Sequence, residues 1–106
     1  MEGSSEIVEG TLFVTSKPAK VLIDPGSTHS FIRPRFMKGT NLKLETLPYT
    51  VEVSTPTGKQ TIESDKMFRG CEIMIREKIF PVDLISLSIH GYDVILEMDS
   101  LAKHYV

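Results

Sequence analysis

Short apolar stretches recur along this chain at close spacing, and glycine, proline and polar residues separate them. Stretches of about four to eight residues with this spacing are typical of an all-β domain. The run Val21-Leu22-Ile23 has no polar interruption, so we predict that its strand is buried on both faces. The predicted strands are Ile7 to Thr15 with an interruption at Gly10, Ala19 to Asp24, Thr50 to Val53, Gln60 to Glu63, Glu72 to Arg76, Ile79 to Leu87 and Tyr92 to Leu96.

Turn residues and short helical signals mark the connections between these strands. Residues 17–18 (Lys-Pro) predict a turn, and residues 54–59, which contain a proline and a glycine, predict the tip of a β-hairpin. Ser30 to Met37 fits either a short strand or a turn of helix, because its proline limits both. Asp99 can cap a short helix over residues 100–105, since its carboxylate can accept from the free amides of the first turn.

Size and charge exclude several classes of protein. The 106 residues suit one small domain, and we assign 1–6 to a flexible polar lead and 7–106 to the domain. The net charge of -2 argues against nucleic-acid and anionic-membrane partners, which require a basic patch. One cysteine permits no internal disulfide. The acidic N-terminus does not fit a signal peptide, and no apolar run approaches the ~20 residues that span a bilayer. We therefore expect a cytoplasmic protein.

Asp24 ends the apolar run and precedes Pro25-Gly26-Ser27-Thr28. A carboxylate at the end of a buried strand is costly unless hydrogen-bond donors meet it. Gly26 permits backbone shapes closed to other residues, and the hydroxyls of Ser27 and Thr28 can donate to a carboxylate or to backbone carbonyls. A carboxylate in such a setting is typical of groups that perform chemistry. The alternative is an ordinary turn capped by Asp24, because Asp-Pro-Gly is a common turn sequence.

The wider sequence favours the chemical interpretation. The run from Val21 to Ile32 resembles the active-site segment of aspartic proteases encoded by gypsy-type LTR retrotransposons, especially those of plants. The run from Tyr92 to Leu101 resembles the closing signature of the same family. The resemblance extends from about Glu9 to Tyr105 and includes entry strands, a flap hairpin and middle strands. It implies an all-β fold, a retropepsin-like closed β-barrel with one short C-terminal helix.

This resemblance implies an aspartic endopeptidase that processes a retrotransposon polyprotein without a metal or other cofactor. Such an enzyme needs two facing carboxylates, of which one keeps a proton and the other is ionised. The ionised carboxylate takes a proton from the attacking water, and the protonated one polarises the peptide carbonyl. The sequence contains one motif of this kind, so the expected dyad is Asp24 from each of two identical chains. The expected partners are a second copy of the chain and an extended peptide.

By the same resemblance, the hairpin from about Val51 to Ile62 is a flap that closes over the substrate and excludes water. Its substrate-binding residues would be those of the tip. The alternative is an ordinary exposed hairpin, which the segment alone would also fit. The predicted tip residues are Ser54, Thr55, Pro56, Thr57 and Gly58.

Two positions of the closing signature depart from the family. Glu97 stands where the family has glycine, and Ser100 stands where it has tryptophan. Glu97 brings bulk and a third carboxylate toward the dyad, and Ser100 loosens local packing. An alternative function follows: a catalytically impaired or domesticated retropepsin-like module for dimerisation or peptide binding. A third interpretation is a cellular retropepsin-like domain of the DNA-damage-inducible type.

The remaining reactive side chains predict no second site. The three histidines lack metal-ligand spacing with Cys71 or a carboxylate. His29 has a packing or hydrogen-bonding role in the family. The strand from Glu72 to Arg76 alternates, with Cys71, Ile73 and Ile75 on its apolar face, so Cys71 is interpreted as a buried thiol. Arg33 and Arg35 are interpreted as a solvated face, with ion pairs between subunits as the alternative.

Overall fold

The computed structural model describes residues 8–24, 27–54 and 61–97. Within these ranges the regular elements are strands and a single 3₁₀ turn, joined by turns and loops. The predicted lead over 1–6 and the predicted helix over 100–105 lie outside the described residues. The elements are β1 (Val8–Val14), β2 (Lys17–Asp24), β3 (Phe31–Ile32), η2 (Pro34–Met37), β4 (Leu44–Ser54), β5 (Thr61–Ile75), β6 (Lys78–Ser86) and β7 (Val94–Glu97).

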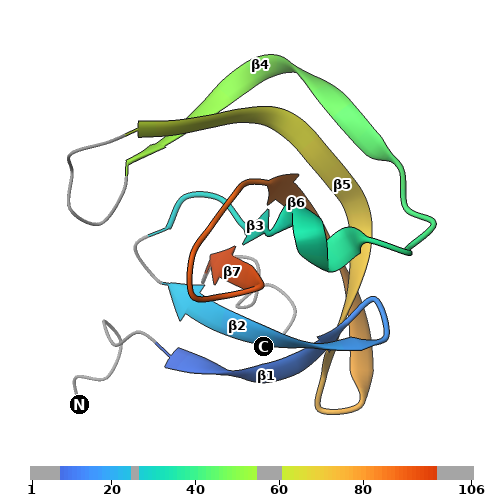
Figure 1. Cartoon of the computed structure of the whole chain (residues 1–106). Helices are drawn as coiled ribbons and strands as arrows, with labels where there is room; N and C mark the ends of the chain where they lie inside the picture. Colours follow the sequence, from blue (N-terminus) through green and yellow to red (C-terminus); the bar gives the residue numbers. More distant parts are fainter. Residues whose placement is uncertain (1–7, 25–26, 55–60, 98–106) are drawn as a thin grey trace.

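The strands close into a ring. They form a 7-stranded sheet in the order β1-β2-β7-β3-β6-β5-β4, and β1 also pairs with β5. This additional pairing joins the two sides of the sheet, while β4 remains outside the ring as the hairpin partner of β5. Figure 1 shows β4 and β5 arching over one side, with β1 and β2 opposite and β3 and β7 between them. The predicted all-β, barrel-like architecture is confirmed.

The predicted turn at Lys17-Pro18 is wrong. The turn lies at Thr15 and Ser16, whose φ angles of 49° and 69° are positive although neither residue is glycine. Both residues that were predicted to turn belong to β2, where Pro18 pairs with Phe13 of β1. A proline is tolerated there because β2 pairs with β7 only from Val21 onward, so its missing N–H breaks no hydrogen bond toward that neighbour.

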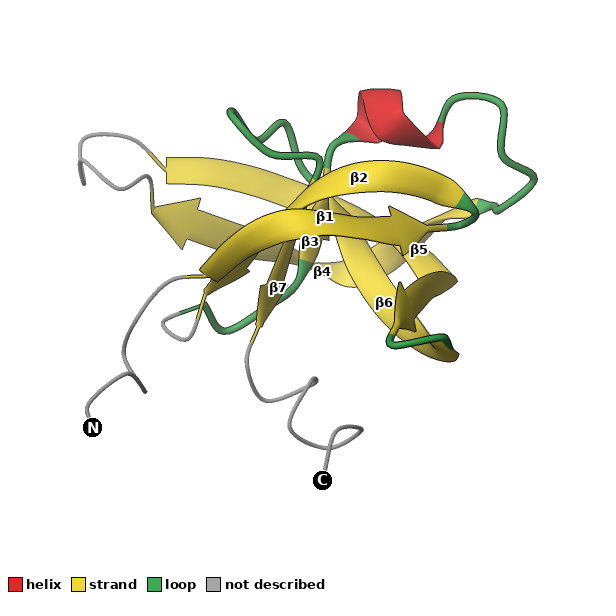
Figure 2. Cartoon of the chain, turned by 90° about the horizontal axis from the view of Figure 1, so that it is seen from below, coloured by secondary structure: helices red, strands yellow, loops and turns green. Residues whose placement is uncertain are grey.

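Several other strand predictions need smaller corrections. Gly10 does not interrupt β1, since it pairs with Val21 within a continuous ladder. The segment from Ser30 to Met37 adopts both predicted structures in succession, first β3 and then η2. Figure 2 shows this short helical turn on the outside of the sheet. The arms of the β4–β5 hairpin are longer than predicted, because the pairing extends back to Leu44 of β4 and Phe68 of β5.

Two apolar clusters fill the interior. The larger lies within the ring and includes Val21, Ile73, Leu84 and Val94, each at most 1% exposed. The smaller packs beneath the β4–β5 hairpin, and its buried members are Phe31, Leu47, Val51, Ile85 and Leu87. The predicted alternation of β5 is confirmed, since Cys71, Ile73 and Ile75 are all buried. The prediction of a strand buried on both faces holds in part, because Leu22 and Ile23 are half-buried.

A register shift divides β5 into two parts. The shift falls between Phe68 and Cys71 in the pairing with β6. Gly70 lies within it at a φ of +66°, a conformation that side chains rarely adopt. The Gly70 N–H donates to Asp83 Oδ1 at 2.9 Å, so the irregular backbone is anchored to β6. On the N-terminal side of the shift β5 pairs mainly with β4, and on the C-terminal side it pairs with β6 and β1.

We predict that Ile73→Ala lowers the free energy of unfolding by about 2–5 kcal/mol, because it empties a fully buried position in the larger cluster. Urea denaturation followed by circular dichroism measures this change. Ile79→Ala is the matched control, since Ile79 is 54% exposed and its truncation leaves almost no cavity. Equal losses for the two variants would contradict the assignment of the core.

Candidate active site

Asp24 is the last residue of β2, where the strand leaves the ring. It is half-buried, and the β2–β7 pairing is parallel with Asp24 opposite Glu97. Beyond it, the N–H of Ser27 donates to the carbonyl of Asp24 at 3.2 Å, which turns the chain back. The predicted turn residues Pro25 and Gly26 lie outside the described residues.

Local hydrogen bonds fix the segment that follows Asp24. Ser27 Oγ donates to the carbonyl of His29 at 2.6 Å, and Thr28 Oγ1 lies 3.0 Å from His29 Nδ1. The His29 ring also lies against Phe31, with 6.3 Å between ring centroids. The two hydroxyls and the histidine therefore form contacts that stabilise the turn itself.

Asp24 lines a cavity of about 300 Å³ together with residues from distant parts of the sequence. Val53 and Ile62, register partners near the described end of the β4–β5 hairpin, line the same cavity. The base of the predicted flap thus faces the predicted catalytic carboxylate. Ser54 ends β4, and the predicted tip residues Thr55, Pro56, Thr57 and Gly58 lie outside the described residues. The cavity's other lining residues are Leu22, Ser27, Phe31, Leu87, Ser88, Ile89, His90, Tyr92 and Ile95.

Ser30 organises the back of the site, a role that the sequence did not predict. Its side chain is buried, and Ser30 Oγ accepts a 3.0 Å hydrogen bond from the N–H of Glu97. Its carbonyl accepts another, at 2.9 Å, from the N–H of Ile85 in β6. Ser30 therefore links β7 to β6 directly behind the turn. Its sequence signal was weak, because a lone serine after a turn usually faces solvent.

Glu97, which stands where the family has glycine, lies next to the site. Because hydrogen-bonded strands lie about 4.8 Å apart, the parallel register makes Asp24 and Glu97 immediate neighbours on adjacent strands. Glu97 is half-buried at the end of β7. The structure thus brings the predicted third carboxylate close to Asp24, within the same strand pair.

Asp93 anchors the loop from 87 to 93 that forms one wall of the cavity. Its carboxylate accepts a 2.8 Å hydrogen bond from the N–H of Lys20, and its N–H donates to the Lys20 carbonyl at 2.8 Å. Its own carbonyl accepts from the N–H of Arg33, also at 2.8 Å. Next to it, Tyr92 donates to Glu9 Oε2 at 2.8 Å, a hydrogen bond that raises the pKa of Tyr92. The wall is therefore held in place by β1, β2 and the β3–η2 junction.

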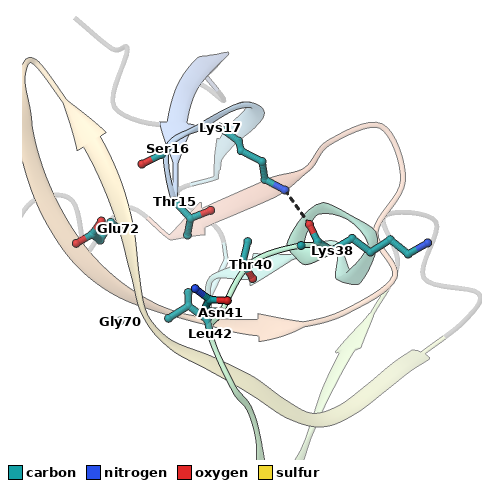
Figure 3. A pocket seen from close by; sticks show the side chains of 10 residues that line it. Thr15, Ser16, Lys17, Lys38, Thr40, Asn41, Leu42, Gly70 and Glu72 are labelled. Carbon is teal, nitrogen blue, oxygen red and sulfur yellow. Dashed lines mark hydrogen bonds between the residues drawn. The ribbon is translucent and has the colours of Figure 1, made fainter.

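A larger cavity of about 560 Å³ lies elsewhere, between the β1–β2 turn and the segment after η2. Figure 3 shows Lys17 reaching across it to the carbonyl of Lys38, 3.4 Å away, while the Lys38 side chain extends outward. Lys17 also donates to the carbonyl of Phe36 and lies 4.5 Å from the centre of that ring. None of the predicted site residues that the structure describes lines this cavity, so the Asp24 cavity is the better candidate for chemistry.

The described residues contain no group of three or more His, Cys, Asp and Glu side chains placed to hold a metal ion. Among the same residues, no helix is long and apolar enough to cross a membrane. Cys71 is fully buried and lies outside the Asp24 cavity, as expected of a structural thiol.

The fold and the site together define a retropepsin-like aspartyl protease domain. The sequence matches the family model described as Retroviral aspartyl protease over residues 1–106, and the chain belongs to this family. No match was found among curated proteins.

Two solved structures have a similar fold. The EIAV protease complexed with the inhibitor HBY-793 matches with a TM-score of 0.70 and 12% identity, over 98% of this chain and 93% of that one. The solution structure of the simian foamy virus (mac) protease matches with a TM-score of 0.56 and 12% identity, over 90% and 92%. At this identity the similarity establishes the fold alone.

The buried thiol gives a prediction on alkaline stability. Burial, with a smaller contribution from Asp83, raises the pKa of Cys71 from 9.0 to about 12. The folded state therefore keeps this proton when the unfolded state has lost it, so Cys71 stabilises the fold below pH 9 and loses this contribution as the pH rises toward 12.

Urea titrations between pH 8 and pH 11 should show the parent losing up to about 1.4 kcal/mol per pH unit relative to Cys71→Val. The valine variant has no thiol, so it provides the baseline for all other titrating groups. Parallel pH profiles for the two proteins would contradict the prediction.

Proposed function

We propose that this chain is the aspartic endopeptidase of a gypsy-type LTR retrotransposon, and that it processes the element's polyprotein in the cytoplasm. The observation that carries the proposal is the shared cavity: Asp24 faces the base of the β4–β5 hairpin across a space of about 300 Å³. Membership of the retroviral aspartyl protease family supports the same activity. In this proposal the hairpin is the flap, and its tip adds backbone hydrogen bonds to an extended peptide.

The proposed active species is a homodimer, because the chemistry needs two carboxylates. Other described aspartates have different partners: Asp65 lies 3.2 Å from the Lys66 amine, Asp83 accepts from Gly70, and Asp93 anchors a loop. Among the described residues that line the cavity, Asp24 supplies the carboxylate. A two-fold axis beside the turn would bring a second Asp24 to face the first.

In the proposed mechanism the two Asp24 carboxylates share one proton, since like charges at close range cannot both ionise. The ionised member accepts a proton from a water molecule, whose oxygen attacks the peptide carbonyl. The protonated member donates to the carbonyl oxygen and stabilises the negative charge that develops there. The tetrahedral intermediate then collapses, the C–N bond breaks, and a proton passes to the leaving amine. The apolar walls from Val53, Ile62 and Ile95 exclude water from the reacting groups.

We predict that Asp24→Asn lowers kcat/KM for a polyprotein-derived peptide at mildly acid pH by roughly 10³-fold or more, because the amide cannot accept the water's proton. Asp65→Asn is the control, since Asp65 lies outside the cavity. When half of the parent subunits are replaced by the Asp24→Asn variant at constant total concentration, random pairing leaves about one quarter of the activity. Activity that is proportional to the parent subunits, or full activity from a sedimentation-defined monomer, would exclude the dimeric site.

Glu97 favours a second candidate function, a catalytically impaired module that dimerises or binds peptides. The register places this carboxylate beside Asp24, where the resemblance leads us to expect glycine. A negative charge there opposes the ionised state of the dyad, and the longer side chain occupies space beside the turn. The two effects can be separated by substitution.

We predict that Glu97→Gly raises kcat/KM by roughly tenfold or more, because it removes both the charge and the bulk. Glu97→Gln keeps the size and removes the charge, so the ratio of the two gains separates electrostatic from steric effects. Peptide cleavage between pH 4 and pH 7 measures both. A parent enzyme that is as fast as Glu97→Gly would exclude the impaired-module function.

A further inference from the structure

A second cavity lies against the wall of the candidate active site. Its volume is about 420 Å³, and its lining residues are Arg33, Pro34, Arg35, Ser88, Ile89 and His90. Two arginines and a histidine thus line one hollow, and no acidic residue is among its described lining residues. The concentration of cationic groups is local, because the chain as a whole carries a net charge of -2.

Arg33 contributes a partly buried side chain to this cavity. Its Nε is buried and has no hydrogen-bond partner among the described residues. Its Nη1 lies 3.9 Å from Asp93 Oδ1, too far for a hydrogen bond, and both side chains are about 30% exposed. The buried Nε is not accessible to a ligand, so an arriving acceptor would meet the exposed part of the Arg33 side chain. This partly buried guanidinium differs from the predicted solvated face.

The charges around the cavity are unequal. Asp93 Oδ1 lies 3.9 Å from Arg33 Nη1 and offsets part of that charge. Arg35 is exposed within η2. His90, from the loop after β6, also lines the cavity. A guanidinium pair of this kind suits a planar carboxylate, which two parallel N–H donors can hold.

The cationic cavity and the Asp24 cavity share one wall. Ser88, Ile89 and His90 line both of them. An extended peptide projects successive side chains to opposite sides, so a residue close to the scissile bond can project over this wall while the backbone stays beside Asp24. The cationic cavity therefore lies within reach of a substrate side chain.

We propose that the cavity between Arg33, Arg35 and His90 is a specificity subsite that binds an acidic side chain, aspartate or glutamate, of the peptide substrate. This inference rests on the proposed function, because it requires a peptide in the Asp24 cavity. In a homodimer the subsite occurs twice, so acidic residues would be favoured on both sides of the cleaved bond.

Binding and cleavage test this inference separately. A set of fluorescent octapeptides, each with one glutamate at a different position, is compared with the matching glutamine peptides by fluorescence anisotropy. The Asp24→Asn protein is used, so that peptides bind without being cut. At one position or more, glutamate should bind about tenfold more tightly than glutamine, and the difference should shrink in high salt.

Arg35→Gln should abolish this preference, since it removes the exposed arginine of the cavity lining. Arg33→Lys keeps the charge but removes the planar fork of N–H donors, and it should reduce the preference in part. Lys78→Gln is the control for net charge, because Lys78 is exposed at the start of β6, outside the cavity. It should leave the preference intact.

Equal binding of glutamate and glutamine peptides, or a preference that survives Arg35→Gln, would overturn the inference. Displacement of the acidic peptide by a short RNA of equal charge at lower concentration would also overturn it, since the site would then recognise phosphate. In a parallel experiment, the protein with Asp24 intact is assayed for cleavage of the glutamine peptides. If the peptides are cleaved without any preference for glutamate, the subsite is excluded and the proposed function remains. If glutamate is preferred but no peptide is cleaved, the proposed endopeptidase is excluded and the subsite remains.

Discussion

The parallel pairing of β2 with β7 is the constraint on which the rest of this structure depends. It joins residues 21–24 to residues 94–97, two segments from opposite ends of the described chain. The pairing places Val21 and Val94 in the core and Asp24 at the point where the ring opens to solvent. The same register fixes which residue stands beside Asp24, so the position of Glu97 follows from the closure of the fold.

Hydrogen bonds within the loops hold the rest of the candidate site in place. The turn after Asp24 is held by its own hydroxyls, Ser30 ties that turn to β6 and β7, and Asp93 fixes the facing wall. Most of these contacts join a backbone group to a short polar side chain close to the site. The carboxylate, the hairpin and the wall are consequently held by the ring, whereas the chemistry we propose needs a second copy of the chain.

The sequence predicted the features that depend on local pattern. Alternation identified Cys71, Ile73 and Ile75 as buried, and the apolar run before Asp24 identified the strand that carries it. The turn at Thr15 and Ser16 was missed, because a positive φ in residues other than glycine is imposed by the pairing around it. The cationic cavity could not be predicted, since it unites residues 33–35 with residues 88–90 through the packing of two loops.

The register shift in β5 has a mechanical consequence. One strand of 15 residues serves both the ring and the hairpin, and Gly70 separates the two parts. On the opposite strand, the β4 pairing also shifts, between Thr46 and Val51. The N–H of Gly70 donates to Asp83 and anchors the shift to β6. The two parts of β5 are therefore held by different neighbours: the part that carries Ile62 into the Asp24 cavity pairs with β4, and the part that closes the ring pairs with β6 and β1.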